Sequence, residues 1–396
     1  MYRFLSFMGI FMFVFIAWLM SENRKKFNFK LTAVGLVLQF VFAVFILKTT
    51  PGKLIFDFLK NGVNKLIDFT NEGASFVFGG LMNEWSFALS ILPTIIFFSS
   101  LFTVLYYFGI LQFFVKLFAR VLRKTLGTSG AESLSAAANI FMGQTEAPLM
   151  VRPFVEKMTR SELMCLMTGG MSTVAGGVLA AYVNMGIDAG HLIAASVMSA
   201  PAAIVIAKIM VPETAEPVTA EVSGVKIEKK DKNVLEAAAR GAGEGMKLAI
   251  NVAAMLIAFI AFVHMFNYFL GFAGTSMEEI LGFIMRPVAF IMGVPWAEAD
   301  TVGRLLGEKT ILNEFIAYKN LADIMKSGGD LSFRSRIIAT YALCGFANLG
   351  SIGIQLGGIG GMAPSRRSEI ASLGFKSMIA GTFASFITAS IAGILM

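Results

Sequence analysis

Residues 307–318 read GEKTILNEFIAY, and this short run decides how the chain is built. It lies at the centre of segment 302–322, which makes no clean membrane span and carries Glu314. An earlier segment, 131–151, reads AESLSAAANIFMGQTEAPLMV; it is apolar enough to enter a membrane, yet it carries Glu146. Because a carboxylate at the centre of a bilayer costs about 2.5–3.5 kcal/mol, such a residue usually faces a ligand, an ion or a pathway. The alternative is that both acids lie in ordinary surface loops.

The composition requires a membrane. Of the 396 residues, 56% are hydrophobic and 15% are charged, and the mean hydropathy is +0.72, whereas a soluble domain has about 25% charged residues. The net charge is +7, and the Lys and Arg residues lie between hydrophobic stretches. This placement is typical of residues that orient a membrane protein rather than of nucleic-acid binding. Segments without Asp, Glu, Lys or Arg predict eight spans, at 4–20, 31–47, 85–115, 163–187, 189–207, 248–277, 337–365 and 377–396.

The loops predict the orientation of these spans. No small-x-small cleavage site follows the first span, and a basic cluster at 24–30 comes directly after it, so it is predicted to be retained with its N-terminus outside. Residues 48–84 and 286–336 then become outer regions of mixed charge. Segment 212–232, rich in Pro, Thr, Glu and Lys, is predicted to be a cytoplasmic loop that divides the chain in two.

A pattern of elements occurs twice. Each acidic segment is followed by a basic patch, by a long helix interrupted by small and polar residues, and by one more span. The interruptions lie at 169–177 (GGMSTVAGG) and 345–351 (GFANLGS). Non-helical backbone at membrane depth is tolerated only where protein or a water-filled cavity lines it. We therefore predict an all-α membrane protein with eight transmembrane helices plus two re-entrant helical hairpins, arranged as an inverted repeat.

The same order divides the chain into five parts. Residues 1–130 are predicted to be N-terminal helices, mostly scaffold, and residues 131–207 the first transport repeat. Residues 208–247 form a cytoplasmic loop and an interfacial segment that contains the close-packing spacing Gly241-x-x-x-Gly245. Residues 248–301 are predicted to be a scaffold helix and a connector, and residues 302–396 the second transport repeat.

Three motifs resemble one family. The run GEKTILNEFIAY, the first-hairpin sequence GQTEAPL at 143–149 with VRPF at 151–154, and CGFAN at 344–348 are similar to signatures of the concentrative nucleoside transporters. One departure is Ile316, where Val is usual in the family. The resemblance covers nearly the whole chain. It implies a homotrimer, a rigid scaffold around a mobile transport domain, and nucleoside uptake driven by a cation gradient.

The resemblance also implies substrate-binding residues. It places Gln144, Thr145 and Glu146 at the nucleobase, and a Gln amide can match a base edge because it both donates and accepts. Their alternative role is to cap a hairpin turn. Glu314 would accept hydrogen bonds from ribose hydroxyls, and Asn348 would complete that grip. The remaining implied contacts are Ser351 at the ribose and three apolar walls around the base, Val178, Leu248 and Phe346.

Alternative roles remain open for these residues as well. Asn348 and Ser351 are also suited to hydrogen bonds between helices, and the three apolar residues to plain helix packing. The implied cation site combines the side chains of Asn139 and Thr173 with the backbone carbonyls of Met142 and Val174. Position 173 is often Ser in the family, so the hydroxyl is kept and a methyl is added.

The predicted function is therefore sodium symport of nucleosides with alternating access, for uridine-like pyrimidine nucleosides and possible adenosine substrates. The alternatives are proton coupling through Glu146 or Glu314, whose pKa burial can raise, and a passive channel. The sequence contains no Gly-x-Ser-x-Gly elbow and no His-Glu-x-x-His, so we predict no enzyme. No cofactor is expected beyond sodium as coupling ion. The expected location is a bacterial inner membrane, with lipid as a partner and no nucleic acid.

Overall fold

The computed structural model describes residues 1–83, 87–218, 231–329 and 331–396, and this part of the chain is helical and contains no strand. The first half has α1 (Tyr2–Leu19), η1 (Arg24–Lys26), α2 (Phe29–Lys48), α3 (Thr50–Phe78), η2 (Gly79–Asn83), α4 (Phe87–Tyr107), α5 (Ile110–Leu126), α6 (Gly130–Ala138), η3 (Ala147–Lys157), α7 (Arg160–Ser172), α8 (Gly176–Met185) and α9 (Ala189–Met210). The second half has α10 (Val234–Gly271), α11 (Met277–Ile291), α12 (Ala299–Ile311), α13 (Glu314–Lys326), α14 (Phe333–Leu343), α15 (Leu349–Met362), η4 (Pro364–Arg366) and α16 (Arg367–Leu395).

Seven helical stretches among the described residues are long and apolar enough to cross a membrane: Tyr2–Leu19, Phe29–Lys48, Ala88–Tyr107, Arg160–Met185, Ala189–Met210, Val234–Gly271 and Pro364–Leu395. They match seven of the eight predicted spans. The eighth, 337–365, is divided between α14 and α15 by a non-helical stretch, so neither helix alone reaches the roughly 20 residues of a span. The all-helical prediction is confirmed, and the count of eight spans is not.

One predicted span was wrong at its C-terminal end. Segment 85–115, whose first residues lie outside the described part, ends as a helix at Tyr107 and not at residue 115. Gly109 has a φ of +81°, which ends the run because this region favours glycine. Residues 110–115 belong to α5, whose buried face contains Leu111 and Val115, while Lys116 is exposed.

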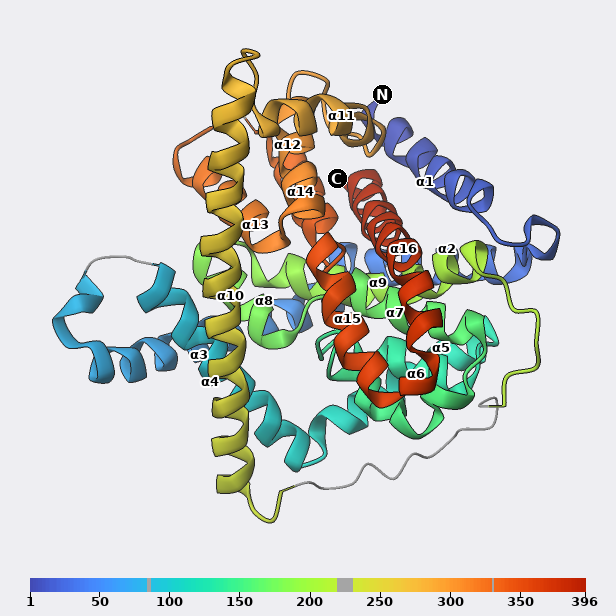
Figure 1. The fold of residues 1–396 in the computed structure, drawn as a ribbon, viewed down its shortest axis with the longest axis horizontal. Helices are drawn as coiled ribbons and strands as arrows, with labels where there is room; N and C mark the ends of the chain where they lie inside the picture. Colours follow the sequence, from blue (N-terminus) through green and yellow to red (C-terminus); the bar gives the residue numbers. More distant parts are fainter. Residues whose placement is uncertain (84–86, 219–230, 330) are drawn as a thin grey trace.

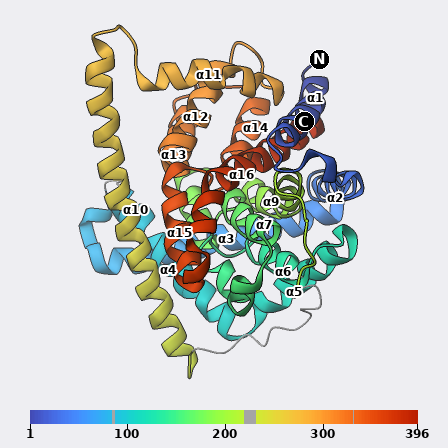
Figure 2. The ribbon, with the colours of Figure 1, turned by 45° about the vertical axis from the view of Figure 1, so that its right-hand side comes forward.

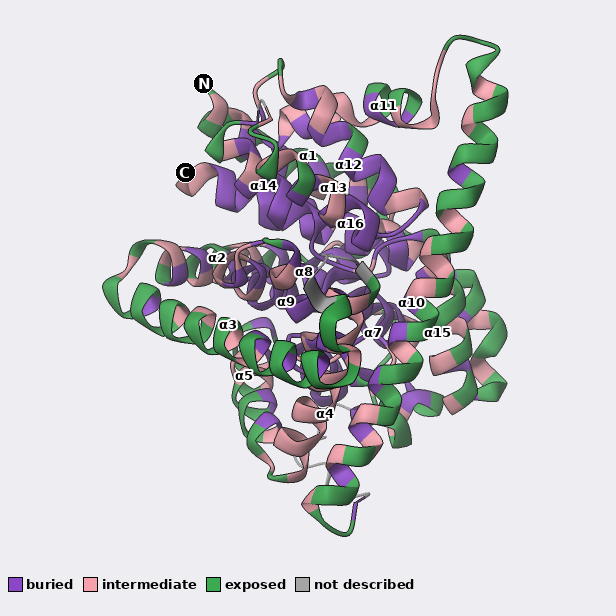
Figure 3. Ribbon diagram, turned by 90° about the vertical axis from the view of Figure 1, so that its left-hand side faces the viewer, coloured by how far each residue is buried: buried purple, intermediate pink, exposed green. Residues whose placement is uncertain are grey.

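The predicted outer region 48–84 contains a helix that hydropathy alone did not reveal. α3 has Pro51 in its first turn, and the Thr49 hydroxyl caps it by accepting from the Gly52 N–H at 3.1 Å. Its charged residues lie on an exposed face, and in Figure 3 α3 lies along the outside of the molecule. Lys60 of α3 forms an ion pair with Asp188, the N-cap of α9, at 2.5 Å.

The two predicted interruptions are confirmed. Helix α7 ends at Ser172 and α8 begins at Gly176, while α14 ends at Leu343 and α15 begins at Leu349. Before the first interruption, α6 and η3 pack against each other, and before the second, α12 and α13 do so. The described elements therefore follow one order twice: a helical pair, a broken helix, and a long helix, α9 or α16.

Helices α9 and α16 form the centre of the molecule (Figures 1 and 2), and α1 and α2 pack on them. Helix α10 stands along one side over the full height of the molecule and pairs with α4. This pairing uses the predicted glycine spacing. A Cβ on Gly241 would lie 2.7 Å from Ser100 Cα, and one on Gly245 would lie 2.8 Å from Ile96 Cα. Only glycine permits so close an approach of the two backbones.

The predicted loop at 212–232 is confirmed in its described parts. Helix α9 ends at Met210, α10 begins at Val234, and residues 211–218 and 231–233 are not helical. Lys226, Lys229 and Lys230, which entered the prediction of a cytoplasmic side, lie outside the described residues.

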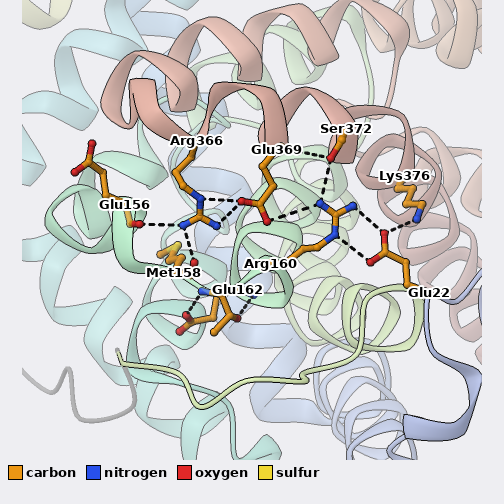
Figure 4. A network of polar contacts seen from close by, with 10 residues as sticks. Glu22, Glu156, Met158, Arg160, Glu162, Arg366, Glu369, Ser372 and Lys376 are labelled. Atoms are coloured by element: carbon orange, nitrogen blue, oxygen red, sulfur yellow. Dashed lines mark hydrogen bonds and ion pairs between the residues drawn. The ribbon is translucent and has the colours of Figure 1, made fainter.

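An ion network joins the ends of helices from both halves (Figure 4). The Arg160 guanidinium, at the start of α7, donates to both Glu22 carboxylate oxygens, at 2.9 and 3.0 Å. Lys376 of α16 forms an ion pair with Glu22, and Glu369 of α16 lies 3.7 Å from Arg160. The hydrogen bond from Arg160 is the main reason that the pKa of Glu22 falls to about 2.

The same network continues to the end of η3. Arg366 pairs with Glu369 at 2.6 Å and donates to the carbonyl oxygens of Glu156 and Met158, at 2.9 and 2.8 Å (Figure 4). These carbonyls close the last turn of η3, where backbone oxygens have no helical partner. The network therefore fastens three parts together: the segment between α1 and α2, the first repeated set (α6, η3, α7, α8 and α9) and the second repeated set (α12 to α16).

Candidate functional site

Glu314 is buried at the start of α13, and its carboxylate accepts hydrogen bonds from two side chains. Asn313 is the N-cap, and its Oδ1 accepts from the Ile316 N–H at 3.0 Å. A carboxylate in the first helical turn is favoured by the helix dipole. The Tyr182 hydroxyl donates to Glu314 Oε1 at 3.0 Å, and Asn348 Nδ2 donates to Oε2 at 2.9 Å. Glu314 thus joins α13 to α8 and α15.

The hydrogen bonds continue from Glu314 to the first hairpin segment. Asn348 caps α15, and its Oδ1 accepts from the Ser351 N–H at 2.9 Å. The Ser351 hydroxyl in turn accepts from Gln144 Nε2 at 2.9 Å. Gln144 Oε1 is buried and has no hydrogen-bond partner among the described residues. Four of the predicted substrate residues therefore form one connected polar chain, which ends in a free acceptor.

The two helix breaks touch each other. Gly345 has a φ of +125°, which other residues rarely adopt. A Cβ at this position would lie 2.8 Å from the Met171 carbonyl oxygen and 2.9 Å from the Ser172 carbonyl carbon. The Ser385 hydroxyl of α16 donates to the Cys344 carbonyl oxygen at 2.7 Å, which satisfies an acceptor that the break exposes.

The first break also contacts the tip of the first hairpin segment. The Gly176 N–H, at the start of α8, donates to the Phe141 carbonyl oxygen at 3.2 Å. A Cβ on Gly143 would lie 3.2 Å from Ala175 Cβ, so the tip lies directly against the break. Non-helical backbone from two separate segments therefore shares one protein-lined region, as expected for a ligand site at membrane depth.

The predicted cation ligands lie in this region. Asn139 is fully buried, its Nδ2 donates to the Ser135 carbonyl oxygen at 3.0 Å, and its Oδ1 has no partner among the described residues. Thr173 lies in the break, and its hydroxyl donates to the Gly169 carbonyl oxygen at 3.0 Å, which leaves its oxygen able to accept. A buried oxygen without a donor suits a hard cation, which prefers oxygen ligands.

The two carbonyl ligands that the resemblance implies, at Met142 and Val174, belong to non-helical residues of the tip and the break. Within the described part of the chain, neither carbonyl oxygen accepts a backbone hydrogen bond. The four residues thus supply oxygens of the right kind, and the ligand set remains a prediction.

Glu146 does not belong to the polar chain around Glu314. Its Oε2 accepts from the Gly143 N–H at 2.7 Å, and the residue is exposed. Thr145 is half-buried, and a Cβ on Gly358 of α15 would lie 3.3 Å from its methyl carbon. Of the three predicted nucleobase residues, only Gln144 is hydrogen-bonded to another predicted site residue.

Within the part of the chain that the structure describes, no bond fixes the predicted apolar walls at the site. Val178 is buried, and Leu248 and Phe346 are half-buried, so plain packing remains an equal explanation for them. From α10, it is Met255 that closely approaches the polar chain, because its Cε would lie 3.3 Å from a Cβ on Gly350. Leu248 lies almost two helical turns before it.

Tyr182 is the site residue that sequence reasoning missed. It is fully buried, its ring packs 4.4 Å from the Tyr318 ring and 4.9 Å from the Phe315 ring, and its hydroxyl reaches Glu314. The available signal was a tyrosine in the otherwise apolar run GGVLAAYVNM, because a buried tyrosine hydroxyl usually finds a partner.

Three family models match the chain in order. A model of the Na+ dependent nucleoside transporter N-terminus matches residues 8–81, one for nucleoside recognition matches 88–189, and one of the Na+ dependent nucleoside transporter C-terminus matches 191–393, more than half of the chain. The chain belongs to the concentrative, Na+-dependent nucleoside transporter family. The prediction of the family is therefore confirmed, and so is the prediction that the chain is a transporter and not an enzyme.

Relatives cover the chain from end to end. The uncharacterized transporter YutK of Bacillus subtilis is 44% identical over an alignment of 401 positions that covers 98% of each chain. Solute carrier family 28 member 3 of Homo sapiens is 43% identical over 98% of this chain, which spans 59% of that protein. CNTnw in an inward-facing substrate-bound state superposes with a TM-score of 0.94 at 42% identity, covering 100% of this chain and 98% of the other. A CNTnw variant in an outward-facing state gives 0.95.

These findings confirm the general function that was predicted for this concentrative nucleoside transporter. It transports nucleosides in a sodium-dependent manner, and its apolar helices belong to a membrane transporter.

Proposed function

We propose that this transporter imports uridine-like pyrimidine nucleosides, with adenosine as a second candidate, by sodium symport with alternating access. The observation that carries the proposal is the buried carboxylate of Glu314, held between Tyr182 and Asn348 and connected through Ser351 to Gln144. A carboxylate accepts two hydroxyl hydrogen bonds with charge-assisted strength, as the vicinal hydroxyls of ribose require.

The polar chain is suited to grip both ends of a nucleoside. Glu314 and Asn348 would bind the ribose hydroxyls, with Ser351 beside them. Gln144 would bind the base, because its amide supplies a donor and its Oε1 is an acceptor that has no partner among the described residues. Thr145 and Glu146 would contact the base from the same tip, and Val178, Leu248 and Phe346 would cover its faces. Tyr182 would hold Glu314 in place.

Sodium would bind beside this grip. Asn139 Oδ1 and the Thr173 hydroxyl would supply two side-chain oxygens, and Met142 and Val174 would supply carbonyl oxygens. The support is Asn139 Oδ1, which is fully buried next to a broken helix and has no hydrogen-bond partner in the described part of the chain. The alternative of proton coupling rests on the burial of the Glu314 carboxylate, because a proton bound there would do the work of the cation.

The architecture that fits this function has eight membrane crossings, with α14 and α15 together forming one of them, and two re-entrant hairpins, α6–η3 and α12–α13, in an inverted repeat. Within residues 1–130, predicted to be mostly scaffold, α4 pairs with α10, whereas α1 and α2 pack on α16 and α9. We therefore assign α4 and α10 to the scaffold of a homotrimer, and α1 and α2 to the moving body with both repeats. The location we propose is a bacterial inner membrane, since relatives of Bacillus subtilis and Haemophilus influenzae cover nearly the whole chain.

The test is uptake of radiolabelled uridine into proteoliposomes, with sodium and proton gradients imposed separately. We expect uridine to accumulate above its outside concentration when only a sodium gradient is present. Accumulation with only a proton gradient would favour the proton alternative, and equilibration without accumulation would favour a passive channel. Competition by unlabelled cytidine, adenosine and free uracil then ranks the substrates, and uracil is expected to compete poorly because it lacks ribose.

A further inference from the structure

Gln355 of α15 is a buried amide that the proposed site does not use. It has no exposed surface, and its Nε2 donates to the Met167 carbonyl oxygen of α7 at 2.9 Å. Because a carbonyl can only accept, the amide nitrogen must face Met167, and Oε1 has no partner in the described part of the chain. A buried amide satisfied on one side only is uncommon, and in a transporter it calls for an explanation.

Gln355 lies one turn beyond Ser351, on the same face of α15. Ser351 accepts from Gln144, and Gln355 donates to Met167, so this face makes two polar contacts with the first repeated set. Both contacts meet at Gly170 of α7. A Cβ on Gly170 would lie 2.8 Å from Gln144 Cβ and 2.8 Å from Gln355 Nε2, so a side chain there would push both away.

The preceding residue, Gly169, contacts two of the proposed cation ligands, Asn139 and Thr173. A Cβ on Gly169 would lie 2.8 Å from Asn139 Nδ2, and the Thr173 hydroxyl donates to the Gly169 carbonyl oxygen at 3.0 Å. Adjacent glycines of one helix, whose Cα atoms are about 3.8 Å apart, therefore support the two proposed sites. Asn139 and Thr173 rest on Gly169, and Gln144 and Gln355 rest on Gly170.

From this geometry we infer that Gln355 is a positioning residue that couples sodium binding to nucleoside binding. This inference rests on the proposed function. A cation bound to Asn139 and Thr173 would fix the last turn of α7 before the break. Gln355 ties that turn to α15, the helix that presents Asn348 and Ser351 to the nucleoside. Without this tie, the cation still binds and the nucleoside still binds, but each loses its effect on the other.

The experiment measures uridine binding to the purified protein in nanodiscs, once in sodium chloride and once in choline chloride of equal ionic strength. The dissociation constant in choline chloride divided by that in sodium chloride measures the coupling. For Gln355→Met, which keeps the length of the side chain and removes the donor, we expect the ratio to fall at least about fivefold. The dissociation constant in choline should stay within about twofold of that of the unaltered protein.

The chain offers a matched control in Gln39 of α2. It is equally buried, its Nε2 donates to the Thr388 hydroxyl at 2.8 Å, and its Oε1 also lacks a partner among the described residues. Gln39→Met should leave the coupling ratio unchanged. A second variant, Gln355→Asn, keeps the amide but shortens its reach by one methylene, and it should lose coupling as Gln355→Met does. It serves as the test if Gln355→Met does not yield folded protein.

Three outcomes would overturn the inference. They are an unchanged ratio in the Gln355 variants, a parallel weakening of uridine binding in both salts, and an equal loss of coupling in Gln39→Met. If the unaltered protein itself binds uridine equally well in both salts, the proposed function fails first, and that result is distinct because it needs no variant.

Discussion

Replacing Glu314 by Gln should nearly abolish uridine transport and leave the fold intact. The two carboxylate oxygens accept from the Tyr182 hydroxyl and from Asn348 Nδ2, both within 3.0 Å. A glutamine has a single acceptor oxygen, so its amide nitrogen must face one of these donors. The variant loses one charge-assisted bond and weakens the other, and hydrogen bonds to charged groups are worth about 1.5–3 kcal/mol each.

These magnitudes give the expected loss for the ribose contact. If the nucleoside hydroxyls depend on the same two oxygens, the loss of binding energy is about 2–4 kcal/mol. At 1.4 kcal/mol per tenfold, kcat/KM for uridine should fall by roughly 30- to 1,000-fold. The assay is initial-rate uptake of radiolabelled uridine into proteoliposomes, at matched protein density and with a fixed sodium gradient. Size-exclusion profiles and thermal melting report whether the variant is folded.

A matched control lies in the same hairpin. Glu308 of α12 is also a buried carboxylate, and it accepts from Asn320 Nδ2 at 2.9 Å without joining the chain to Asn348. Glu308→Gln should keep uptake within about threefold, since Asn320, the donor to Glu308, does not belong to the polar chain around Glu314. Normal uptake by Glu314→Gln, or an equal loss in Glu308→Gln, would refute the ribose role of Glu314.

Three further outcomes follow from the structure. Asn139→Ala removes the unpartnered oxygen and should raise the sodium concentration for half-maximal uptake about tenfold or more, the loss of one ligand contact of about 1.4 kcal/mol; an unchanged sodium dependence would remove Asn139 from the site. Gly345→Ala should destabilise the protein by about 1–3 kcal/mol, because alanine meets both a φ of +125° and the Met171 carbonyl oxygen; thermal melting measures this loss, and a melting temperature equal to that of the unaltered protein would contradict it. The Glu22 network should stabilise the protein fully above pH 4.5 and lose this contribution as the pH falls toward about 2, since the folded-state pKa lies below the ordinary value; the difference in melting temperature from Glu22→Gln should therefore shrink below pH 4.5, and a constant difference would exclude the ion network as its cause.

Much of the fold was predictable because hydropathy and helix-breaking residues act locally. Seven apolar helices and both breaks, at 169–177 and 345–351, were found from runs of residues without charges and from clusters of glycine. The helix over Thr50–Phe78 was not found, since its charged face keeps the average hydropathy low. The interruption of segment 337–365 was predicted from its small and polar residues, but the contact of Gly345 with Met171 was not, since no local window contains it.

The site was predictable to a different degree. Family motifs named Glu314, Asn348, Ser351 and Gln144, which the structure joins by hydrogen bonds. They did not name Tyr182, because its partner lies 132 positions later in the chain and only the folded chain brings the two together. They also named Glu146, whose carboxylate accepts from the Gly143 N–H, and its contact with the base stays a prediction. The direction in which a side chain points at a hairpin tip is set by backbone geometry, which a motif does not record.

The crossing of the two helix breaks restricts how the chain can vary. Met171 lies between two glycines of the other half. A Cβ on Gly345 would lie 2.8 Å from the Met171 carbonyl oxygen, and a Cβ on Gly381 would lie 2.5 Å from the Met171 Cβ. A side chain at either glycine forces the backbone around Met171, in the other half, to move. A mutation accepted on one side of this contact must therefore be compensated on the other side, so residues far apart in the sequence are bound to vary together.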